Sequence, residues 1–159
     1  MKIILASKSG VRKQILDKYR INNEVMFSNV DEDEVKESLL AEGASPSIIS
    51  KNLAEIKSIK VSNKNPDRLV LGADSVIALN NEIINKPRSR NEAFSILKKL
   101  NNSTHLLISS VCISKNGSMI WNHTDTSELK MKNLDDSSLT KYLNKIKTET
   151  LLAYGLYQI

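Results

Sequence analysis

The dipeptide Asn116-Gly117 is the sequence feature that most constrains the fold of this chain. It separates two stretches rich in apolar residues, 105–114 and 118–123, and Asn-Gly is typical of the tight turns that join antiparallel strands. Asn80-Asn81 predicts a second hairpin of the same kind, because asparagine tolerates the positive φ that such turns require. The chain therefore contains a β-sheet with antiparallel neighbours.

Helical patterns alternate with these strands. Four stretches carry apolar residues at helical spacing and are predicted to be helices: 11–19, 46–61, 91–100 and 135–146. Further strands are predicted at 2–6, 24–27, 69–71 and 129–134, the third ending in Gly72-Ala73-Asp74. This mixture predicts an α/β fold with a mixed sheet, and the absence of repeats or linkers favours one domain over residues 1–159.

Composition excludes several classes of protein. With Cys112 as the single cysteine, no disulfide can form within the chain, and the longest apolar runs are too short to span a membrane. His105 and His123 lack the spacing of zinc ligands. The net charge of +5 favours anionic partners, but aromatic residues make up only 4%, too few for stacking on single-stranded nucleic acid. We expect a soluble cytoplasmic protein that binds neither membrane nor nucleic acid.

A polar turn after the first strand is one candidate site. Ser7, Ser9 and Arg12 lie where a strand ends and a helix begins. The free N–H groups and positive dipole end of such a helix bind phosphate, and Arg12 could add a forked donor. Alternatively, Ser9 is only a helix cap and Arg12 a solvated surface residue.

Carboxylates and lysines elsewhere suggest further chemistry. Asp74 directly follows a buried strand, where α/β sheets bind ligands, and could hold Mg²⁺ or accept a proton from water. Alternatively, it is a turn residue beside Gly72. The acidic run 31–34 could hold a cation or be a solvated loop, and Lys57 and Lys86 could each neutralise phosphate or be ordinary surface lysines.

Taken in order, these motifs resemble the Maf family, the septum-formation-inhibitor-like nucleotide pyrophosphatases related in fold to inosine triphosphatases. Residues 5–16, LASKSGVRKQIL, are similar to the family's opening LASxSxxRxxLL motif. The other matching segments are Val30-Asp31-Glu32, Leu53-Ala54-Glu55-Ile56-Lys57, Leu71-Gly72-Ala73-Asp74-Ser75, Asn85-Lys86-Pro87 and Gly155-Leu156-Tyr157.

The resemblance implies a twisted mixed sheet flanked by helices in two lobes around a cleft. It also implies hydrolysis of noncanonical or modified nucleoside triphosphates between the α and β phosphates, with Mg²⁺ or Mn²⁺ as cofactor. The residue roles that it implies are substrate binding by Ser7, Ser9, Arg12 and Ser75, charge neutralisation by the catalytic Lys57 and Lys86, metal binding by Glu32 and Asp74, and general base catalysis by Asp74. A homodimer is the default oligomer.

Three departures from the family pattern qualify these expectations. Val11 stands where members active on thymidine triphosphate usually carry an arginine, so we expect a different substrate preference. Ser75 replaces a commoner threonine. Members usually continue beyond the Gly155-Leu156-Tyr157 motif, so the domain is expected to be truncated at its C-terminus relative to the family. The alternative functions are a nucleotide-binding remnant with a regulatory role and a basic RNA-binding protein.

Overall fold

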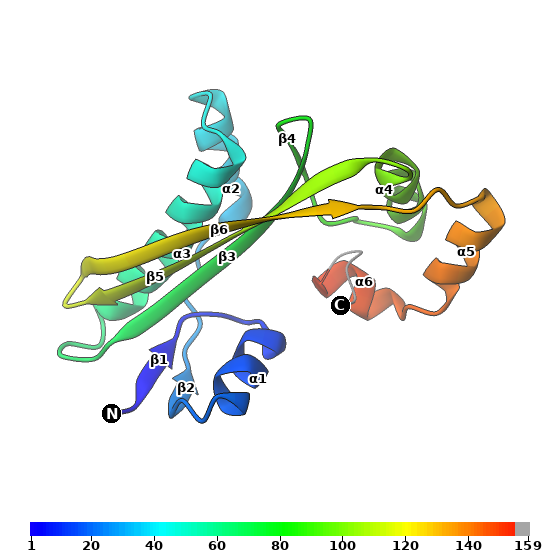
Figure 1. Ribbon diagram of the computed structural model, residues 1–159. Coiled ribbons are helices and arrows are strands. Elements are labelled where there is room, and N and C mark those ends of the chain that lie inside the picture. The colour runs from blue at the N-terminus through cyan, green and yellow to red at the C-terminus, as the bar shows by residue number, and fades with distance from the viewer. Residues whose placement is uncertain (155–159) are drawn as a thin grey trace. The chain divides into compact units, whose positions relative to one another are not determined.

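Three long strands, β3 (Val70–Leu79), β5 (Thr104–Lys115) and β6 (Ser118–Lys130), run through both units of the structure, a computed structural model that describes residues 1–154 (Figure 1). The first unit comprises Met1–Ser75 and Ile108–Thr126, and the second comprises Val76–Leu107 and the chain from Ser127 onward. The Gly155-Leu156-Tyr157 motif lies outside the described residues.

The first unit is built on short parallel strands at one side of the sheet. β1 (Ile3–Leu5) pairs in parallel with both β2 (Asn23–Val25) and β3, and the strand order is β2-β1-β3-β5-β6. Ile4, Ala6, Val61 and Val70 form its buried apolar cluster. Its helices are α1 (Gly10–Lys18), α2 (Glu32–Ala41) and α3 (Pro46–Ser62).

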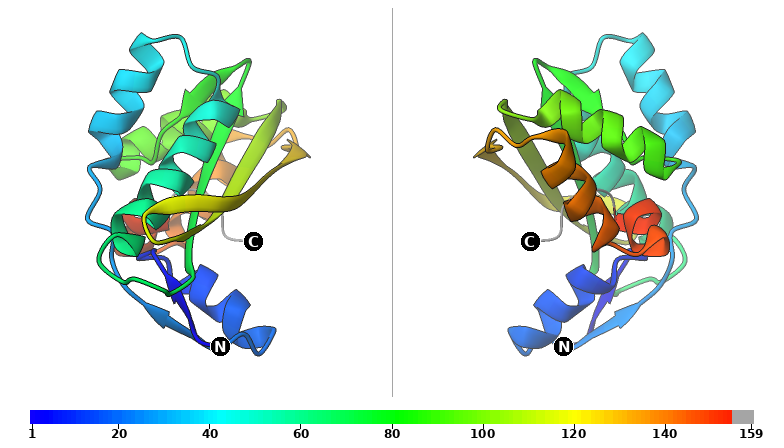
Figure 2. Two further views of the ribbon diagram at one scale, coloured as in Figure 1. Left: turned by 90° about the vertical axis from the view of Figure 1, so that its left-hand side faces the viewer. Right: turned by 90° about the vertical axis from the view of Figure 1, so that its right-hand side faces the viewer.

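Helix α3 lies against β3 at a distance that only glycine permits (Figure 2). A Cβ atom on Gly72 would come within 2.1 Å of the main-chain oxygen of Ala54. Buried serines fasten the rest of the helix: the hydroxyl of Ser58 bonds that of Ser114 on β5 at 2.7 Å, and the hydroxyl of Ser62 accepts from the Gly117 N–H at 3.0 Å. The helix is thereby held to the sheet by polar contacts as well as by apolar packing.

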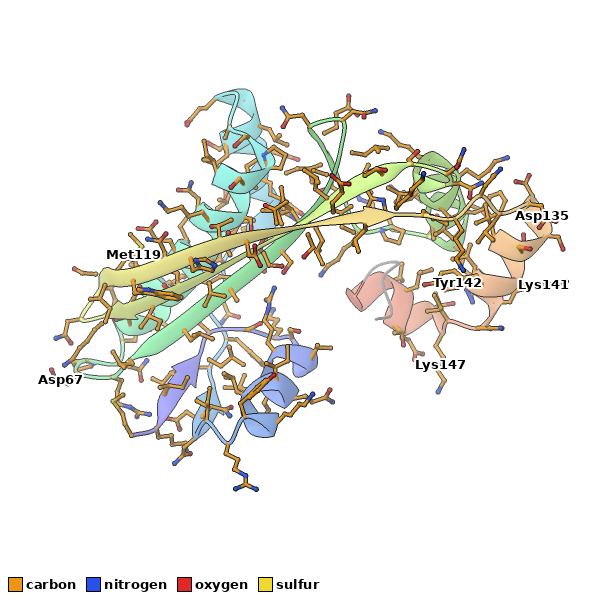
Figure 3. All side chains as sticks on the ribbon, viewed as in Figure 1. Asp67, Met119, Asp135, Lys141, Tyr142 and Lys147 are labelled. Atoms are coloured by element: carbon orange, nitrogen blue, oxygen red, sulfur yellow. The ribbon has the colours of Figure 1, made fainter. Side chains whose placement is uncertain are left out.

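The second unit has a separate core. β4 (Glu82–Ile84) pairs antiparallel with the end of β3, and the helices are α4 (Arg90–Leu100), α5 (Asp136–Asn144) and α6 (Thr148–Tyr154). Its buried apolar residues come from β3, from all three helices and from the turn between α5 and α6: Leu79, Ala93, Leu97, Leu100, Leu139, Leu143, Ile146 and Leu151. Figure 3 labels Asp135, which caps α5 by accepting from the Ser138 N–H at 2.7 Å.

The structure confirms most of the predicted elements. Both hairpins form, with positive φ at Asn80, Asn81, Asn116 and Gly117, and the predicted helices are all present. In Figure 3, Asp67 lies near the tip of the β5–β6 hairpin, where its N–H donates to the Asn116 side chain at 2.6 Å. Cys112 is fully buried in the core of the first unit, as expected.

Three expectations about the elements are wrong. β3 does not end at Gly72-Ala73-Asp74 but continues to Leu79, because Gly72 serves the close approach of α3 and not a turn. The acidic run is not a loop, since Asp31 caps α2 and Glu32, Asp33 and Glu34 form its first turn. β6 is one strand to Lys130, so the separate strand predicted at 129–134 does not form.

Among the described residues, none of the helices is both long and apolar enough to cross a membrane. Location in the cytoplasm stays a prediction from the sequence.

Candidate functional site

The turn between β1 and α1 forms a compact set of donors and hydroxyls. Ser9 is the N-cap of α1, and its hydroxyl accepts from the Arg12 N–H at 3.5 Å. The hydroxyl of Ser7, which is buried, accepts from the Ser9 N–H at 3.2 Å and from Arg12 Nη1 at 3.1 Å. The sequence places a serine, a helix N-terminus and a guanidinium together here, an arrangement suited to an anion.

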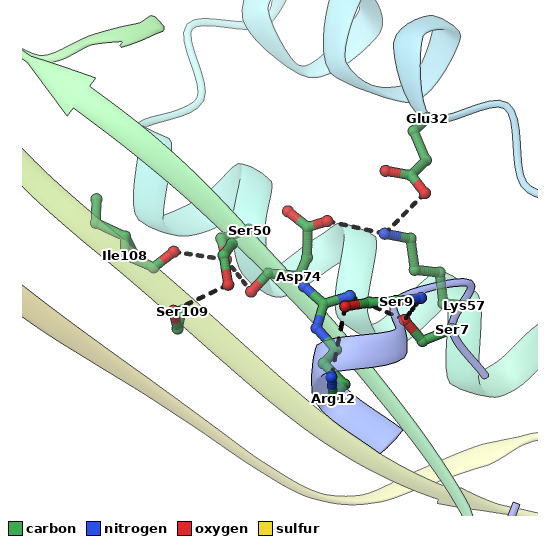
Figure 4. Close-up of polar contacts among 10 residues, drawn as sticks. Ser7, Ser9, Arg12, Glu32, Ser50, Lys57, Asp74, Ile108 and Ser109 are labelled. Atoms are coloured by element: carbon green, nitrogen blue, oxygen red, sulfur yellow. Dashed lines mark hydrogen bonds and ion pairs between the residues drawn. The ribbon is translucent and has the colours of Figure 1, made fainter. Parts of the chain in front are cut away.

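Lys57 of α3 lies between two carboxylates (Figure 4). Its Nζ atom is 2.8 Å from Oδ1 of Asp74 on β3 and 2.9 Å from Oε1 of Glu32, the first residue of α2. The side chains of Lys57 and Asp74 are only 5% and 8% exposed, whereas that of Glu32 is 45% exposed. The ammonium group thus joins a buried carboxylate to one that reaches solvent.

Burial is the dominant influence on Asp74. It raises the pKa of this carboxyl above its ordinary value of 3.8, and the nearby charge of Glu32 adds to the rise. The charge and hydrogen bond of Lys57 lower this pKa, and so does the charge of Arg12. Together they do not cancel the rise. The second carboxylate oxygen, Oδ2, is buried and has no hydrogen-bond partner. A carboxylate in this state is a stronger proton acceptor than an exposed one.

Arg12 belongs to the same electrostatic cluster. Burial lowers the pKa of its guanidinium, while the charges of Asp74 and Glu32 raise it. An arginine keeps its charge in such surroundings because its ordinary pKa lies far above neutral pH. The two cations Arg12 and Lys57 therefore balance the two carboxylates.

Ser50 fixes the main chain that carries Asp74. It is fully buried on α3, two helical turns before Lys57, and its hydroxyl proton is shared between the main-chain oxygens of Asp74 and Ile108, at 3.3 and 3.5 Å. Figure 4 shows this contact on the same stretch of β3 as the Asp74 carboxylate. Sequence reasoning missed Ser50; the spacing of Ser50, Ala54, Ser58 and Ser62 at every fourth residue was the signal that a polar face of α3 is buried.

The structure brings most of the predicted site residues together. Ser7, Ser9, Arg12, Glu32, Lys57 and Asp74 form one connected cluster within the first unit. Ser75 lies on the opposite face of β3 from Asp74, because side chains alternate along a strand, and its hydroxyl bonds that of Ser109 at 2.9 Å. Lys86 is exposed and belongs to the second unit.

The donor set limits which metal could bind. In the part of the chain that the structure describes, no three His, Cys, Asp or Glu side chains converge. Two carboxylates, those of Glu32 and Asp74, each place one oxygen at the Nζ atom of Lys57, so that Oε1 of Glu32 and Oδ1 of Asp74 converge on one point. Mg²⁺ is typically bound by one or two carboxylates together with substrate phosphates, so these residues fit such an ion.

Comparison with known proteins gives three results. The sequence profile described as Maf-like protein matches residues 2–159. A nucleoside triphosphate pyrophosphatase of Pelagibacter ubique (strain HTCC1062) is 60% identical over 157 residues, which are 99% of this chain and 80% of that protein. A 7-methyl-GTP pyrophosphatase of Brucella abortus biovar 1 (strain 9-941) is 33% identical over 159 residues, 100% of this chain and 80% of that protein.

One solved structure supports the fold. A HAM1 protein from Coxiella burnetii superposes with a TM-score of 0.53 at 14% sequence identity, covering 82% of this chain and 72% of that one. The resemblance that the sequence motifs suggested is thus confirmed, and so is the expectation of a mixed α/β fold.

Proposed function

The chain belongs to the Maf family, and from this premise we propose that it is an enzyme that hydrolyses nucleoside triphosphates to a nucleoside monophosphate and pyrophosphate. The bond cleaved is the anhydride between the α and β phosphates. The relatives named as nucleoside triphosphate pyrophosphatase and 7-methyl-GTP pyrophosphatase support this reaction class. The alternative of a binding remnant is not favoured, because the cluster keeps both of its carboxylates and both of its cations.

The observation that carries the proposal is the Glu32–Lys57–Asp74 contact beside the α1 N-terminus. Hydrolysis of a polyanion requires neutralisation of charge and positioning of water more than any other assistance. Ser7, Ser9 and Arg12 would bind the phosphates through hydroxyls, backbone N–H groups and the guanidinium. Lys57 would turn to a phosphate oxygen when the substrate is bound.

Asp74 is the proposed general base. Its raised pKa makes it a better proton acceptor than an ordinary aspartate. Of its two oxygens, Oδ1 pairs with Lys57, whereas Oδ2 has no partner and is the atom that would take the proton of the attacking water.

Glu32 and Asp74 would hold a divalent cation, Mg²⁺ or Mn²⁺, jointly with the substrate phosphates. When bound, such an ion neutralises phosphate charge and lowers the pKa of coordinated water. The support for this part of the proposal is the two-carboxylate donor set, in which Oε1 of Glu32 and Oδ1 of Asp74 converge on one point.

The remaining assignments are proposed from the family resemblance. Residues 1–159 act as one catalytic domain, Lys86 neutralises phosphate charge, Ser75 assists substrate binding and the protein forms a homodimer. The substrates are noncanonical or modified nucleotides. Val11, which is exposed on the first turn of α1, replaces a charge with an apolar contact and favours a substrate other than thymidine triphosphate.

Pyrophosphate release from a panel of canonical, deaminated and methylated nucleoside triphosphates tests the function, with Mg²⁺, with Mn²⁺ and with a chelator. We expect release only with metal. Asp74→Asn should lower the rate by about 10²–10⁴-fold, because the carboxamide cannot accept the proton. Asp17→Asn, which changes an exposed carboxylate of α1 paired with Lys13, should leave the rate unchanged.

Two results would contradict the proposal. One is the absence of pyrophosphate from every nucleotide, and the other is orthophosphate in its place, which would move the cleaved bond to the terminal phosphate. Circular dichroism of Asp74→Asn should match that of the wild type, which would distinguish loss of the base from unfolding. Fastest turnover on thymidine triphosphate would refute the expected substrate preference.

A further inference from the structure

The ammonium group of Lys57 contacts an oxygen of each carboxylate in the proposed metal site. We propose that Lys57 is an internal counter-ion that keeps a bare divalent cation from Glu32 and Asp74, so that metal and nucleotide bind only together. This inference rests on the proposed function, since it concerns how the same site accepts its substrate.

The geometry makes lysine and metal compete. Nζ of Lys57 lies 2.8 Å from Asp74 Oδ1 and 2.9 Å from Glu32 Oε1. A cation bound to the same two oxygens needs distances of about 2.0–2.6 Å, and therefore needs the space that the ammonium fills. The Lys57 side chain is 5% exposed, so it cannot leave the carboxylates and simply enter water.

The charge balance gives the same result. In the absence of ligands, the carboxylates of Glu32 and Asp74 are matched by Lys57 and Arg12. A divalent cation alone would add two positive charges and leave a buried ammonium without a partner, which is costly. A triphosphate arriving with the metal supplies anionic oxygens for the displaced ammonium. Metal and nucleotide should therefore raise each other's affinity by the same factor.

Binding of Mn²⁺ to the nucleotide-free protein, measured by electron paramagnetic resonance of the free ion, tests this inference without any activity assay. We expect weak binding to the wild type and binding on the order of tenfold tighter to Lys57→Met, which keeps the length of the side chain and removes its charge. Lys60→Met is the matched control, because Lys60 is exposed on the same helix and bonds the main-chain oxygen of Asn29. It should not change Mn²⁺ affinity.

A second measurement begins with the wild type, so that its main outcome does not depend on the folding of a variant. A nucleoside triphosphate analogue with a methylene group between the α and β phosphates should raise Mn²⁺ affinity by roughly 5- to 150-fold, and by clearly less in Lys57→Met or Lys57→Gln. Equal Mn²⁺ affinity with and without the analogue would overturn the inference. So would unchanged affinity in both Lys57 variants, or an equal gain in Lys60→Met.

Failure of the proposed function gives a different pattern. In that case no pyrophosphate is released by the wild type, whereas tighter Mn²⁺ binding by Lys57→Met would still show that the lysine occupies a metal site. Conversely, pyrophosphate release together with strong Mn²⁺ binding by the nucleotide-free wild type would preserve the function and refute the role of Lys57.

Discussion

Two residues set the position of the carboxylates in the proposed site without contacting them. Ser50 bonds the main-chain oxygen of Asp74, and Asp31 caps the helix that begins with Glu32 by accepting from the Glu34 N–H at 3.1 Å. Both act through backbone groups, and so they hold a carboxylate in place without contacting it.

Ser50→Ala should lower kcat by roughly fivefold and leave KM nearly unchanged, because losing a hydrogen bond of about 1 kcal/mol loosens the main chain that carries Asp74, the proposed base. Steady-state kinetics on the preferred nucleotide measure this. Ser95→Ala, which removes an exposed serine bonded to Asn91 within α4, should change neither constant. A rise in KM at constant kcat would show that Ser50 affects substrate binding and not the base.

His105 predicts a pH dependence of stability. Burial on β5 lowers the pKa of its imidazole below the ordinary value of 6.5, so the unfolded chain takes up the proton more readily than the folded one. Stability should therefore fall as pH is lowered through 6.5, and fall less steeply in His105→Gln. Thermal unfolding between pH 7.5 and 5.5 (about two pH units around the histidine pKa) measures how steeply stability changes with pH. His123→Gln should keep the wild-type slope, and parallel curves for His105→Gln and wild type would contradict the prediction.

At the scale of elements, α2 and β3 show why part of the structure escaped prediction. α2 buries none of its side chains, so it lacks the apolar stripe by which helices are found. Its only signal was the cap, Asp31 followed three residues later by Glu34. In β3, Gly72 and Asp74 resemble turn residues. Gly72 is needed instead because α3 packs closely on the strand, and the residue of α3 that it meets, Ala54, lies 18 residues earlier in the chain.

The candidate site was easier to predict than these elements. Ser9 as a cap and Arg12 one turn into a helix follow from local sequence, and the structure confirms that placement. The contact of Lys57 with both Glu32 and Asp74 joins three elements, and no local pattern specifies it. Only the family resemblance pointed to these three residues together.

Gly72→Ala tests the packing of α3 on β3. The new Cβ would lie 2.1 Å from the main-chain oxygen of Ala54, so the helix must move away and carry Lys57 from Asp74. We expect a loss of about 1–3 kcal/mol or more in unfolding free energy and a large loss of activity. Urea denaturation and the pyrophosphate assay measure the two effects.

Gly43→Ala separates steric contact from conformational strain. Gly43 has a φ of +76° but no atom within 4 Å of an added Cβ, so its replacement should cost about 1–2 kcal/mol without affecting the rate of the folded enzyme. Equal stability and activity for Gly72→Ala and the wild type would show that α3 does not need this close approach.

At the scale of the whole molecule, the two units have separate apolar cores. Leu139 is fully buried among the helices of the second unit, whereas the Glu32–Lys57–Asp74 contact belongs to the first. A substitution in the core of the second unit should therefore lower stability without removing any contact of the Glu32–Lys57–Asp74 cluster.

Leu139→Ala should reduce the unfolding free energy by about 2–5 kcal/mol, because it leaves a cavity among α4, α5 and α6. Hydrogen exchange followed by mass spectrometry should show faster exchange in peptides from α4 and α5 at a denaturant concentration where peptides from α3 remain protected. Uniformly faster exchange in both units would show that they open as one.

The serine spacing on α3 has a consequence for the position of the helix along β3. Ser50, Ser58 and Ser62 would repeat every four residues without interruption if Ala54 were also a serine. Sliding the helix by one turn, about 5.4 Å, would then exchange one hydroxyl for another and bring Val61 to the position of Lys57. Because Ala54 breaks the series, such a slip would put a methyl group opposite the Asp74 carbonyl. The interruption therefore makes one register of the helix, the one that pairs Lys57 with Asp74, lower in free energy than its neighbours.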